Sequence, residues 1–296
     1  MPGASGVEHR VPGSPNDIAP TSPARPSTGI SVIIASFKVR DLLARCLATV
    51  TDADEVLVVD NASQDGTREL VRLDFPKVRL IANDANVGFG AAVNQAARLA
   101  AGDFLLMLNP DTELPKGALQ AMRREMDIRP EAAVIGFRQV DANGEFQLAI
   151  GPRPSFVLEL ARMIVQHRLD GGDARLAAWL DRCLGRPRSV SWVSGAALLV
   201  RASAFRLIGG FDESFFLYFE DADFCLRARA QGEVWYVPDV TVIHHRGRSA
   251  LLNRSVANRA YRDSQRKYWR RYRGSWSATA IEAYQGLRTT LGSHGR

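Results

Sequence analysis

Cysteine is scarce in this sequence, and long apolar runs are absent. The three cysteines, Cys46, Cys183 and Cys225, are far apart and odd in number, which argues against both a disulfide framework and a zinc cluster. This cysteine usage fits a reducing compartment, so we expect a cytoplasmic protein. The longest clean apolar runs, such as Phe104–Leu108 and Ala196–Val200, are much shorter than the roughly 18 residues of a membrane-spanning helix. An integral membrane protein is therefore not expected.

The C-terminal part of the chain is the one region in which acidic residues are scarce. The 296-residue chain has a net charge of +6, yet residues 246–296 hold 12 Lys and Arg against two acidic residues, so the rest of the chain is net acidic. This tail also contains aromatic residues between the basic ones, namely Tyr261, Tyr268, Trp269, Tyr272 and Trp276. The pattern is typical of a solvated helix face, and also of a surface for anionic lipid headgroups, where Arg, Trp and Tyr all gather. Nucleic acid is a third class of partner for such a surface.

Apolar residues are sparse at the other end of the chain. Residues 1–28 contain six of the 14 prolines, and proline breaks regular secondary structure. No apolar stretch follows a basic one there, as it would in a secretory signal. We therefore expect residues 1–28 to be disordered.

Short apolar runs and helical patterns alternate from Ile30 onward. The predicted strands are Ile30–Ala35, Glu55–Val59, Val78–Ala82 and Phe104–Leu108, and the predicted helices are 39–50, Thr67–Leu73 and Gly88–Ala100. Continuous apolar strands that alternate with helices predict an α/β fold, with a mostly parallel central sheet and helices on both faces. In such a sheet, ligands bind beyond the carboxyl ends of the strands.

Polar residues stand just after three of these strands: Ser36, Asp60 and Asp111. Asp60 precedes Asn61 and can accept a hydrogen bond from a nucleotide base or ribose, or cap the turn that follows. Asp111 ends the Asn109-Pro110-Asp111 loop, in which proline fixes the direction of the chain. Divalent cations such as Mg²⁺ and Mn²⁺ bind carboxylates together with phosphate oxygens. Asp111 is therefore a candidate metal ligand, and an ordinary turn is the alternative.

A glycine pair follows the third predicted strand. Gly88 and Gly90 imitate a dinucleotide-binding fingerprint, but the third glycine is missing and the strand is not the first. A dehydrogenase is correspondingly a distant alternative. We interpret these glycines as permitting close approach of another group at a helix start, with Asn94 one turn into that helix.

The segment Phe215–Arg227, FFLYFEDADFCLR, is the most unusual part of the sequence. A helix is predicted to start near Glu220, and acidic residues in a first helical turn suit the helix dipole. Acidic residues beside aromatic ones also suit a general base in a partly dry pocket. His244 and His245 follow an apolar strand at Val240–Ile243, and an imidazole there is a further candidate metal ligand.

Taken in order, these blocks resemble those of family 2 glycosyltransferases, the inverting enzymes of the GT-A fold. The blocks are SVIIAS at 31–36, VVDNAS at 58–63, NVGFG at 86–90 with Asn94, LNPD at 108–111, VSGA at 193–196, GGFD at 209–212, FED at 219–221 and HH at 244–245. The Asn-Pro-Asp and Phe-Glu-Asp blocks resemble the rhamnosyltransferase-like branch. The resemblance covers about residues 29–250, so we predict a disordered segment at 1–28, a GT-A domain at 29–250 and a basic, aromatic helical tail at 251–296.

The resemblance implies a role for each matching residue. Asp221 would be the catalytic base, with Glu220 beside it. Trp192 and Gly195 would line the acceptor or donor pocket. The residues implied in nucleotide-sugar binding are Ala35, Ser36, Asp60, Asn61, Gly88, Asn94 and Asn109.

A cofactor and partners are implied as well. Asp111 and His244 would hold a divalent metal, Mg²⁺ or Mn²⁺, although Asn109 stands where the family's Asp-x-Asp element has its first Asp. The donor would be a UDP- or dTDP-sugar, and the acceptor a glycan or a lipid-linked glycan in polysaccharide biosynthesis. Such transferases commonly act at the cytoplasmic face of a membrane, so the basic tail would contact anionic lipid peripherally. Nucleic acid is not expected as a partner.

Two functions other than glycosyl transfer are compatible with an α/β sheet of this kind. A nucleotidyltransferase would have a Gly-rich basic loop straight after the first strand, where this sequence has SFKVR at 36–40 and no glycine. A non-catalytic carbohydrate-binding module would not need Asp111, Asp221 and His244 to converge. We interpret residues 151–190, where Arg, Leu and Ala are mixed at helical spacing, as an insertion on the acceptor side.

Overall fold

The computed structural model describes residues 29–245, 254–274, 277 and 279, so the predicted disorder of residues 1–28 lies outside it. The strands are β1 (Ile30–Ser36), β2 (Glu55–Asn61), β3 (Arg79–Asn83), β4 (Phe104–Leu108), β5 (Thr112–Glu113), β6 (Ala132–Val140), β7 (Phe146–Gln147), β8 (Ile150–Gly151), β9 (Arg188–Ser189), β10 (Trp192–Val193), β11 (Ala197–Arg201) and β12 (Glu233–His244). The helices are α1 (Arg40–Ala48), α2 (Thr67–Asp74), α3 (Phe89–Ala97), α4 (Ala118–Asp127), α5 (Phe156–Asp170), α6 (Ala174–Cys183), α7 (Ala202–Leu207), α8 (Glu220–Ala228) and α10 (Arg254–Arg273).

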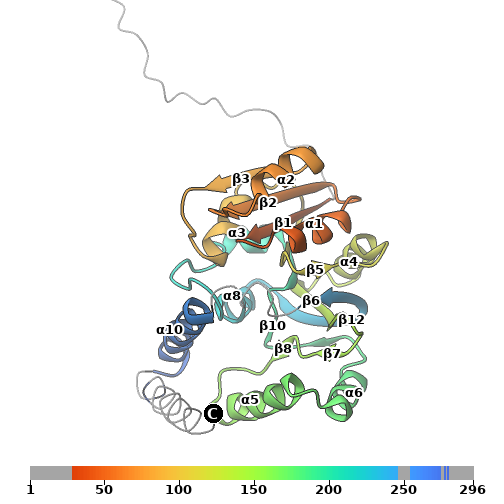
Figure 1. The fold of residues 1–296 in the computed structure, drawn as a ribbon. Coiled ribbons are helices and arrows are strands. Elements are labelled where there is room, and N and C mark those ends of the chain that lie inside the picture. The colour runs from red at the N-terminus through yellow and green to blue at the C-terminus, as the bar shows by residue number, and fades with distance from the viewer. Residues whose placement is uncertain (1–28, 246–253, 275–276, 278, 280–296) are drawn as a thin grey trace, which may run out of the picture.

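The central sheet confirms the predicted α/β architecture (Figure 1). Its main path runs β3-β2-β1-β4-β11-β6-β12-β5. Strands β3, β2, β1 and β4 are parallel neighbours, and β6 is parallel to β12. Strand β11 is antiparallel to both β4 and β6, and β5 is antiparallel to β12. The sheet is therefore mixed but mostly parallel, as predicted.

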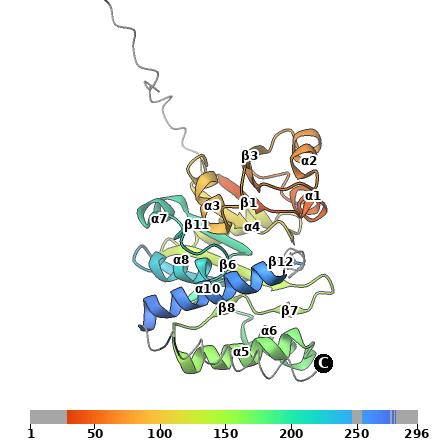
Figure 2. The ribbon, with the colours of Figure 1, turned by 60° about the vertical axis from the view of Figure 1, so that its left-hand side comes forward.

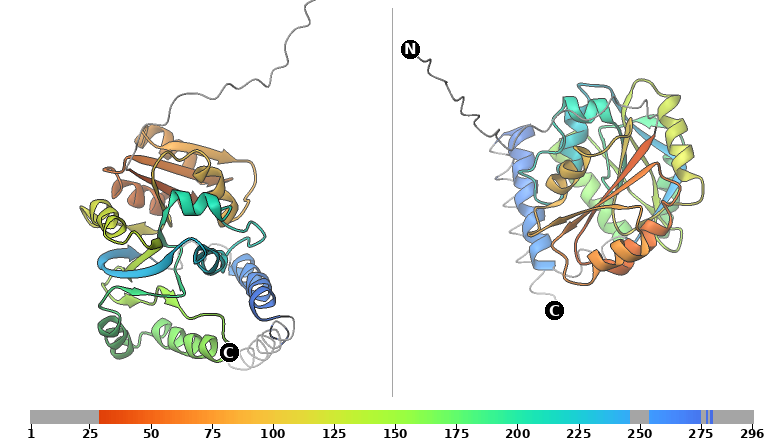
Figure 3. Two further views of the ribbon diagram at one scale, coloured as in Figure 1. Left: turned by 180° about the vertical axis from the view of Figure 1, so that it is seen from behind. Right: turned by 90° about the horizontal axis from the view of Figure 1, so that it is seen from above.

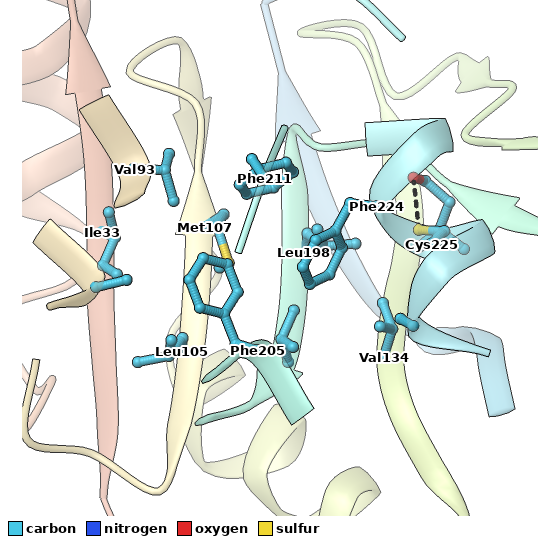
Figure 4. Close-up of a cluster of buried hydrophobic side chains, with 14 of the residues drawn as sticks. Ile33, Val93, Leu105, Met107, Val134, Leu198, Phe205, Phe211, Phe224 and Cys225 are labelled. Atoms are coloured by element: carbon cyan, nitrogen blue, oxygen red, sulfur yellow. Dashed lines mark hydrogen bonds between the residues drawn. The ribbon is translucent and has the colours of Figure 1, made fainter. Parts of the chain in front are cut away.

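Helices cover both faces of this sheet (Figure 3). One core lies between the sheet and α3, α7 and α8, and Figure 4 shows Phe205, Phe211 and Phe224 packed there against sheet residues. The other core lies between the sheet and α1, α2 and α4. Neighbouring side chains of a strand point to opposite faces, so Val32 and Ile33 are both fully buried, one in each core. Two covered faces explain why the strands read as continuous apolar runs.

The sequence pattern placed several element boundaries well and missed others. Strand β4 coincides with the predicted Phe104–Leu108, and α8 begins at Glu220 as predicted. Helix α3 ends three residues before its predicted end. Strand β12 is much longer than the predicted Val240–Ile243, because it continues through a register shift between Val237 and Thr241. That irregularity accommodates a proline inside the strand.

Helix α10 packs against α8 and the loop that precedes it. Tyr268 and Trp269 are buried in a cluster with Phe215 and Ala222 of the α8 region. These two aromatic residues therefore do not form an exposed lipid-binding surface, and that interpretation of them is wrong. In water, a helix that packs on a domain buries its large apolar side chains against an apolar surface of that domain. Trp276 lies outside the described residues.

Ion pairs made by Arg271 hold α10 in this position. Its guanidinium lies 2.5 Å from Asp212 Oδ2 and 2.6 Å from Asp223 Oδ1, and the Tyr272 hydroxyl donates to the same Asp223 oxygen. Asp223 also binds Arg227, one turn along α8. Asp223 is therefore a structural acid that holds α10 on α8. Within the described residues, no helix combines the length and apolar character that crossing a bilayer requires.

Candidate active site

A cavity of about 550 Å³ lies where the carboxyl ends of β1, β2, β4 and β12 meet the start of α8. Parallel strands expose their last residues and the following loops at one edge, which is where ligands bind in such sheets. Most of the predicted site residues line this cavity: Ala35, Ser36, Asn61, Gly88, Asn109, Asp111, Trp192, Gly195, Glu220, Asp221 and His244. Tertiary structure thus brings together groups that are up to about 200 residues apart.

Asp221 is held by two backbone groups. Gly195 N–H donates to Oδ2 at an N···O distance of 2.9 Å, and Ala222 N–H donates to Oδ1 at 2.8 Å. A Cβ at position 195 would lie 3.3 Å from the Cβ of Asp221, so glycine allows this close approach. The carboxylate is fixed in orientation at the cavity wall.

Glu220 and Asp221 have different electrostatic surroundings. Burial raises the pKa of Glu220 well above its ordinary value of 4.5, and the charge of Asp221 raises it further. Burial also raises the pKa of Asp221 above 3.8, but the Gly195 and Ala222 N–H groups and the Arg162 guanidinium oppose that rise. Glu220 Oε2 is buried without a hydrogen-bond partner among the described residues. The Gly195 and Ala222 N–H groups and Arg162 therefore favour the charged form of Asp221, whereas burial and the neighbouring charge favour the protonated form of Glu220.

The loop before α8 is strained. Tyr218 and Phe219 have φ angles of 69° and 66°, which side-chain-bearing residues rarely adopt and which cluster at functional sites. The loop is anchored from α3, where Phe89 N–H donates to Phe216 O at 3.0 Å. A Cβ on Gly88 would lie 2.4 Å from that carbonyl oxygen. The predicted close approach at Gly88 is therefore confirmed, and the approaching group is this loop's backbone.

Asp111 and His244 lie together at the cavity wall. Asp111 is 2% exposed, and its Oδ1 lies 3.4 Å from His244 Nε2. Pairing of β5 with β12 sets this geometry, and His245 N–H donates to Asp111 O. No group of three or more His, Cys, Asp or Glu side chains suited to a metal occurs in the described part of the chain. One carboxylate and one imidazole nevertheless fit a divalent ion whose other ligands are phosphate oxygens and water.

Two predicted site residues do not line the cavity. Asn94 exchanges hydrogen bonds with the backbone of Phe211, donating to its carbonyl and accepting from its N–H at 2.9 Å each. It thus clamps the loop that leads toward α8. Asp60 is paired with Ser36 in the sheet and fully buried, and it accepts from Arg68 Nε at 2.6 Å. Its Oδ1 has no partner among the described residues.

Helix α5 and helix α10 supply cavity residues that the motifs did not indicate. Glu159, Arg162 and Gln166 project from α5, and Tyr261 projects from α10. Arg162 donates twice to Glu159, at 2.9 and 2.6 Å, and lies 5.8 Å from the centre of the Trp192 ring. The three α5 residues recur at helical spacing, which is the one signal that could have placed them on a common face.

Comparisons with known proteins agree with this geometry. The sequence model for Glycosyl transferase family 2 matches residues 31–176. The chain is 32% identical over 238 residues to the N-acetylglucosaminyl-diphospho-decaprenol L-rhamnosyltransferase of Mycobacterium tuberculosis, which covers 74% of this chain and 77% of that protein. It is 25% identical to the rhamnosyltransferase WbbL of Escherichia coli, over 79% of this chain and 88% of that protein.

Solved structures share the fold at low identity. TarS of S. aureus in complex with UDP-GlcNAc superposes with a TM-score of 0.52 at 17% identity, over 80% of this chain and 64% of that one. GalNAc-T7 with UDP, GalNAc and Mn²⁺ gives a TM-score of 0.53 at 15% identity, over 74% of this chain and 44% of that one. The chain therefore spans less than two thirds of the length of these structures. Both support the GT-A form of the α/β fold.

Proposed function

The chain belongs to glycosyltransferase family 2, and from this premise we propose that it transfers a sugar, with rhamnose the first candidate, from a UDP- or dTDP-sugar to a hydroxyl of a lipid-linked glycan. At the coarser level it is a nucleotide-sugar-dependent glycosyltransferase of polysaccharide or glycan biosynthesis. The observation that carries the proposed transfer to a hydroxyl is the Asp221 carboxylate, held by two backbone N–H groups in the strand-end cavity.

Asp221 would act as the general base. Its raised pKa makes it a better proton acceptor than an exposed Asp, while its two N–H donors favour the ionised form that can accept a proton. It would take the proton of the acceptor hydroxyl as that oxygen attacks the anomeric carbon. The nucleoside diphosphate would leave from the opposite face, so the configuration inverts. Gly195 would contribute by orienting the base.

The nucleotide would lie against the ends of β1 and β2. Ala35, Ser36 and Asn61 line this part of the cavity, and Ser36 Oγ is buried without a hydrogen-bond partner among the described residues. A buried hydroxyl of this kind is stabilised when a ligand supplies the missing hydrogen bond. Asp60 lies next to Ser36 in the sheet. From this buried position it would orient the nucleobase or the ribose of the nucleotide.

A divalent ion would be held by Asp111 and His244. When bound, it supplies Lewis-acid stabilisation of the departing diphosphate. His244 Nδ1 is buried without a hydrogen-bond partner in the described part of the chain, and Asn109 lines the same wall. Because only one carboxylate is present, substrate phosphate would complete the ligand set, so metal binding would be weak without the donor.

A lipid-linked acceptor is proposed from the relative's name. The Mycobacterium tuberculosis protein is named for N-acetylglucosaminyl-diphospho-decaprenol. We propose an acceptor of the same kind here, used at the inner face of the membrane, with the basic C-terminal segment in peripheral contact with anionic lipid. Lys and Arg near such a surface are attracted by its negative potential.

The test is a donor panel assayed with the purified full-length protein. UDP- and dTDP-linked sugars are offered with a short-chain diphosphate-linked GlcNAc acceptor, with and without EDTA, and both the glycan product and the released nucleotide are measured. Transfer with release of a nucleoside diphosphate supports the proposal. With pyrophosphate added in place of the acceptor, formation of a nucleoside triphosphate and a sugar 1-phosphate would indicate a nucleotidyltransferase, and sugar binding without turnover would indicate a non-catalytic module.

A further inference from the structure

Helix α5 has its polarity reversed relative to an ordinary surface helix. Its polar residues Glu159, Arg162 and Gln166 face the cavity, and Glu159 is 8% exposed. Several of its apolar residues are exposed instead, although Leu169 near the end of the helix packs against the core. A helix that packs on a core normally buries its apolar stripe and exposes its charges, so the outer face of α5 requires a separate explanation.

The outward residues form a continuous apolar ridge. Val157, Leu160, Ala161 and Ile164 are all exposed and follow the i, i+3, i+4, i+7 spacing of one helix face. Val157 is 73% exposed, Ile164 56% and Leu160 39%. Phe156, at the start of the helix, is 40% exposed. Contiguous exposed apolar side chains of this size mark an interaction surface. We call these five residues the α5 ridge.

Helix α10 presents an arginine stripe. Arg259, Arg262, Arg266, Arg270 and Arg273 recur every three or four residues and are all exposed, so they share one face of the helix. The opposite face is buried, with Ala260, Ser264 and Tyr268 turned toward the domain. The stripe therefore lies on the face of α10 opposite the buried one, and Arg273 at its end reaches the backbone that precedes α5.

The two helices border the same cavity. The α5 side chains Glu159, Arg162 and Gln166 form one wall, and Val256, Ala257 and Tyr261 of α10 form another. Arg273 Nε donates to Pro154 O just before α5, at 2.5 Å. In Figure 2, α10 runs across the molecule above α5, with β8 between the two helices. The helices that carry the ridge and the stripe thus both border the cavity that holds the proposed base.

We propose that the α5 ridge and the α10 arginine stripe together bind an anionic lipid bilayer, with the ridge entering the acyl boundary and the stripe contacting headgroups. Apolar residues flanked by Arg are the composition of interfacial membrane helices, and the stripe supplies the charge complementarity that a second copy of the same basic chain would lack. The inference rests on the proposed function only for the membrane location of the acceptor. Its consequence is that the cavity opens beside the lipid from which that acceptor is presented.

The experiment measures flotation of the full-length protein with vesicles of phosphatidylglycerol and phosphatidylcholine, and with phosphatidylcholine alone. The triple variant Val157→Gln, Leu160→Gln, Ile164→Gln removes the ridge while keeping helix-forming residues. We expect it to lower the partition coefficient onto anionic vesicles by on the order of 100-fold. Its transfer to a water-soluble short-chain acceptor should stay within about 2-fold of wild type, because none of the three residues lines the cavity.

A matched control uses exposed apolar residues elsewhere. Leu73, Ile128 and Leu207 are 78%, 60% and 72% exposed, and the corresponding triple Gln variant should bind vesicles as wild type does. A second variant, Arg259→Gln, Arg262→Gln, Arg270→Gln, should lose on the order of 100-fold on anionic vesicles but little on neutral ones. Circular dichroism confirms that each variant is folded.

Three results would overturn the inference. One is a folded ridge variant that floats as wild type does. Another is equal loss of binding in the matched control. The third is a wild-type protein that does not bind vesicles but is a dimer by light scattering, while the ridge variant is a monomer. The ridge would then be a protein interface. Failure of the proposed function is a separate outcome, seen as absent transfer to the soluble acceptor while flotation behaves as expected.

Discussion

Replacement of Asp221 by Asn is the most direct perturbation of the proposed chemistry. The amide has nearly the same shape as the carboxylate but cannot accept a proton. A positioned general base contributes about 10²- to 10⁴-fold, so kcat should fall by that factor, equivalent to about 2.7 to 5.4 kcal/mol in the activation barrier. The side chain accepts from two N–H groups in the native site, and Asn has only one carbonyl oxygen. One donor is then left unsatisfied, which should cost about 1–3 kcal/mol of stability.

The assay must separate catalysis from folding. Nucleoside diphosphate release is followed with a soluble acceptor at a temperature well below the melting point of the variant, which circular dichroism establishes. The wild-type rate should fall as the pH drops through the pKa of Asp221, which lies above 3.8 because of burial, and the Asn variant should lack this acid limb. Glu220→Gln is the matched control, since a protonated Glu already resembles Gln, and it should cost less than about 10-fold. A folded Asn variant within about 10-fold of wild type, or with an unchanged acid limb, would refute the assignment.

Four other perturbations test the site and the fold. Glu220→Gln should stabilise the protein increasingly as the pH rises above 4.5, because the pKa of the native Glu is raised and its contribution to stability is lost with rising pH. Urea melts in which the variant and the wild type differ in unfolding free energy by the same amount at about pH 4 and pH 8 would contradict this. Gly88→Ala should cost about 2–4 kcal/mol through strain and a backbone clash, while Gly117→Ala, with φ 77° and nothing within 4 Å, should cost only about 1 kcal/mol by chemical denaturation. Arg271→Met should lose about 1–3 kcal/mol of stability, because it removes a half-exposed partner from two carboxylates. Burial raises the pKa of Asp212, but the hydrogen bond from Arg271 helps bring it down to about 2 from 3.8, and stability from a lowered pKa is lost as the pH falls through that range. Acid melts of the variant should therefore show less decline between about pH 4 and pH 2, and equal acid sensitivity would count against the pairing. Asp111→Ala should abolish any stimulation by added Mn²⁺, which a metal titration of the transfer rate checks, and a retained response would remove Asp111 from the proposed metal site.

Local sequence pattern predicted most of the fold around the site. Strands β1, β2 and β4 are apolar on both faces, and polar residues end β1 and β2 and follow β4. That pattern follows from burial of both faces in a parallel sheet, and it also places polar groups at the carboxyl edge. The α8 start at Glu220 was predictable because acidic residues favour a first helical turn.

Other features depended on distant partners. Asn94 sits on the predicted helix, but its hydrogen bonds go to Phe211, over 100 residues away. Tyr268 and Trp269 read as interfacial aromatics, yet α8 offers an apolar surface that buries them. A periodic pattern describes one face of a helix and does not say which other element covers that face.

The amino-acid order by itself determined the strand-helix alternation, the polar strand ends and the acidic start of α8, because these depend on neighbours within a few residues. Tertiary structure alone decided that Gly195 would orient Asp221, that His244 would lie beside Asp111, and that α5 would turn its charges inward and its apolar ridge outward. The physical reason is range. Secondary structure follows from local backbone and side-chain preferences, whereas a hydrogen bond, a pKa and the exposure of a face depend on which distant surface the folded chain brings alongside.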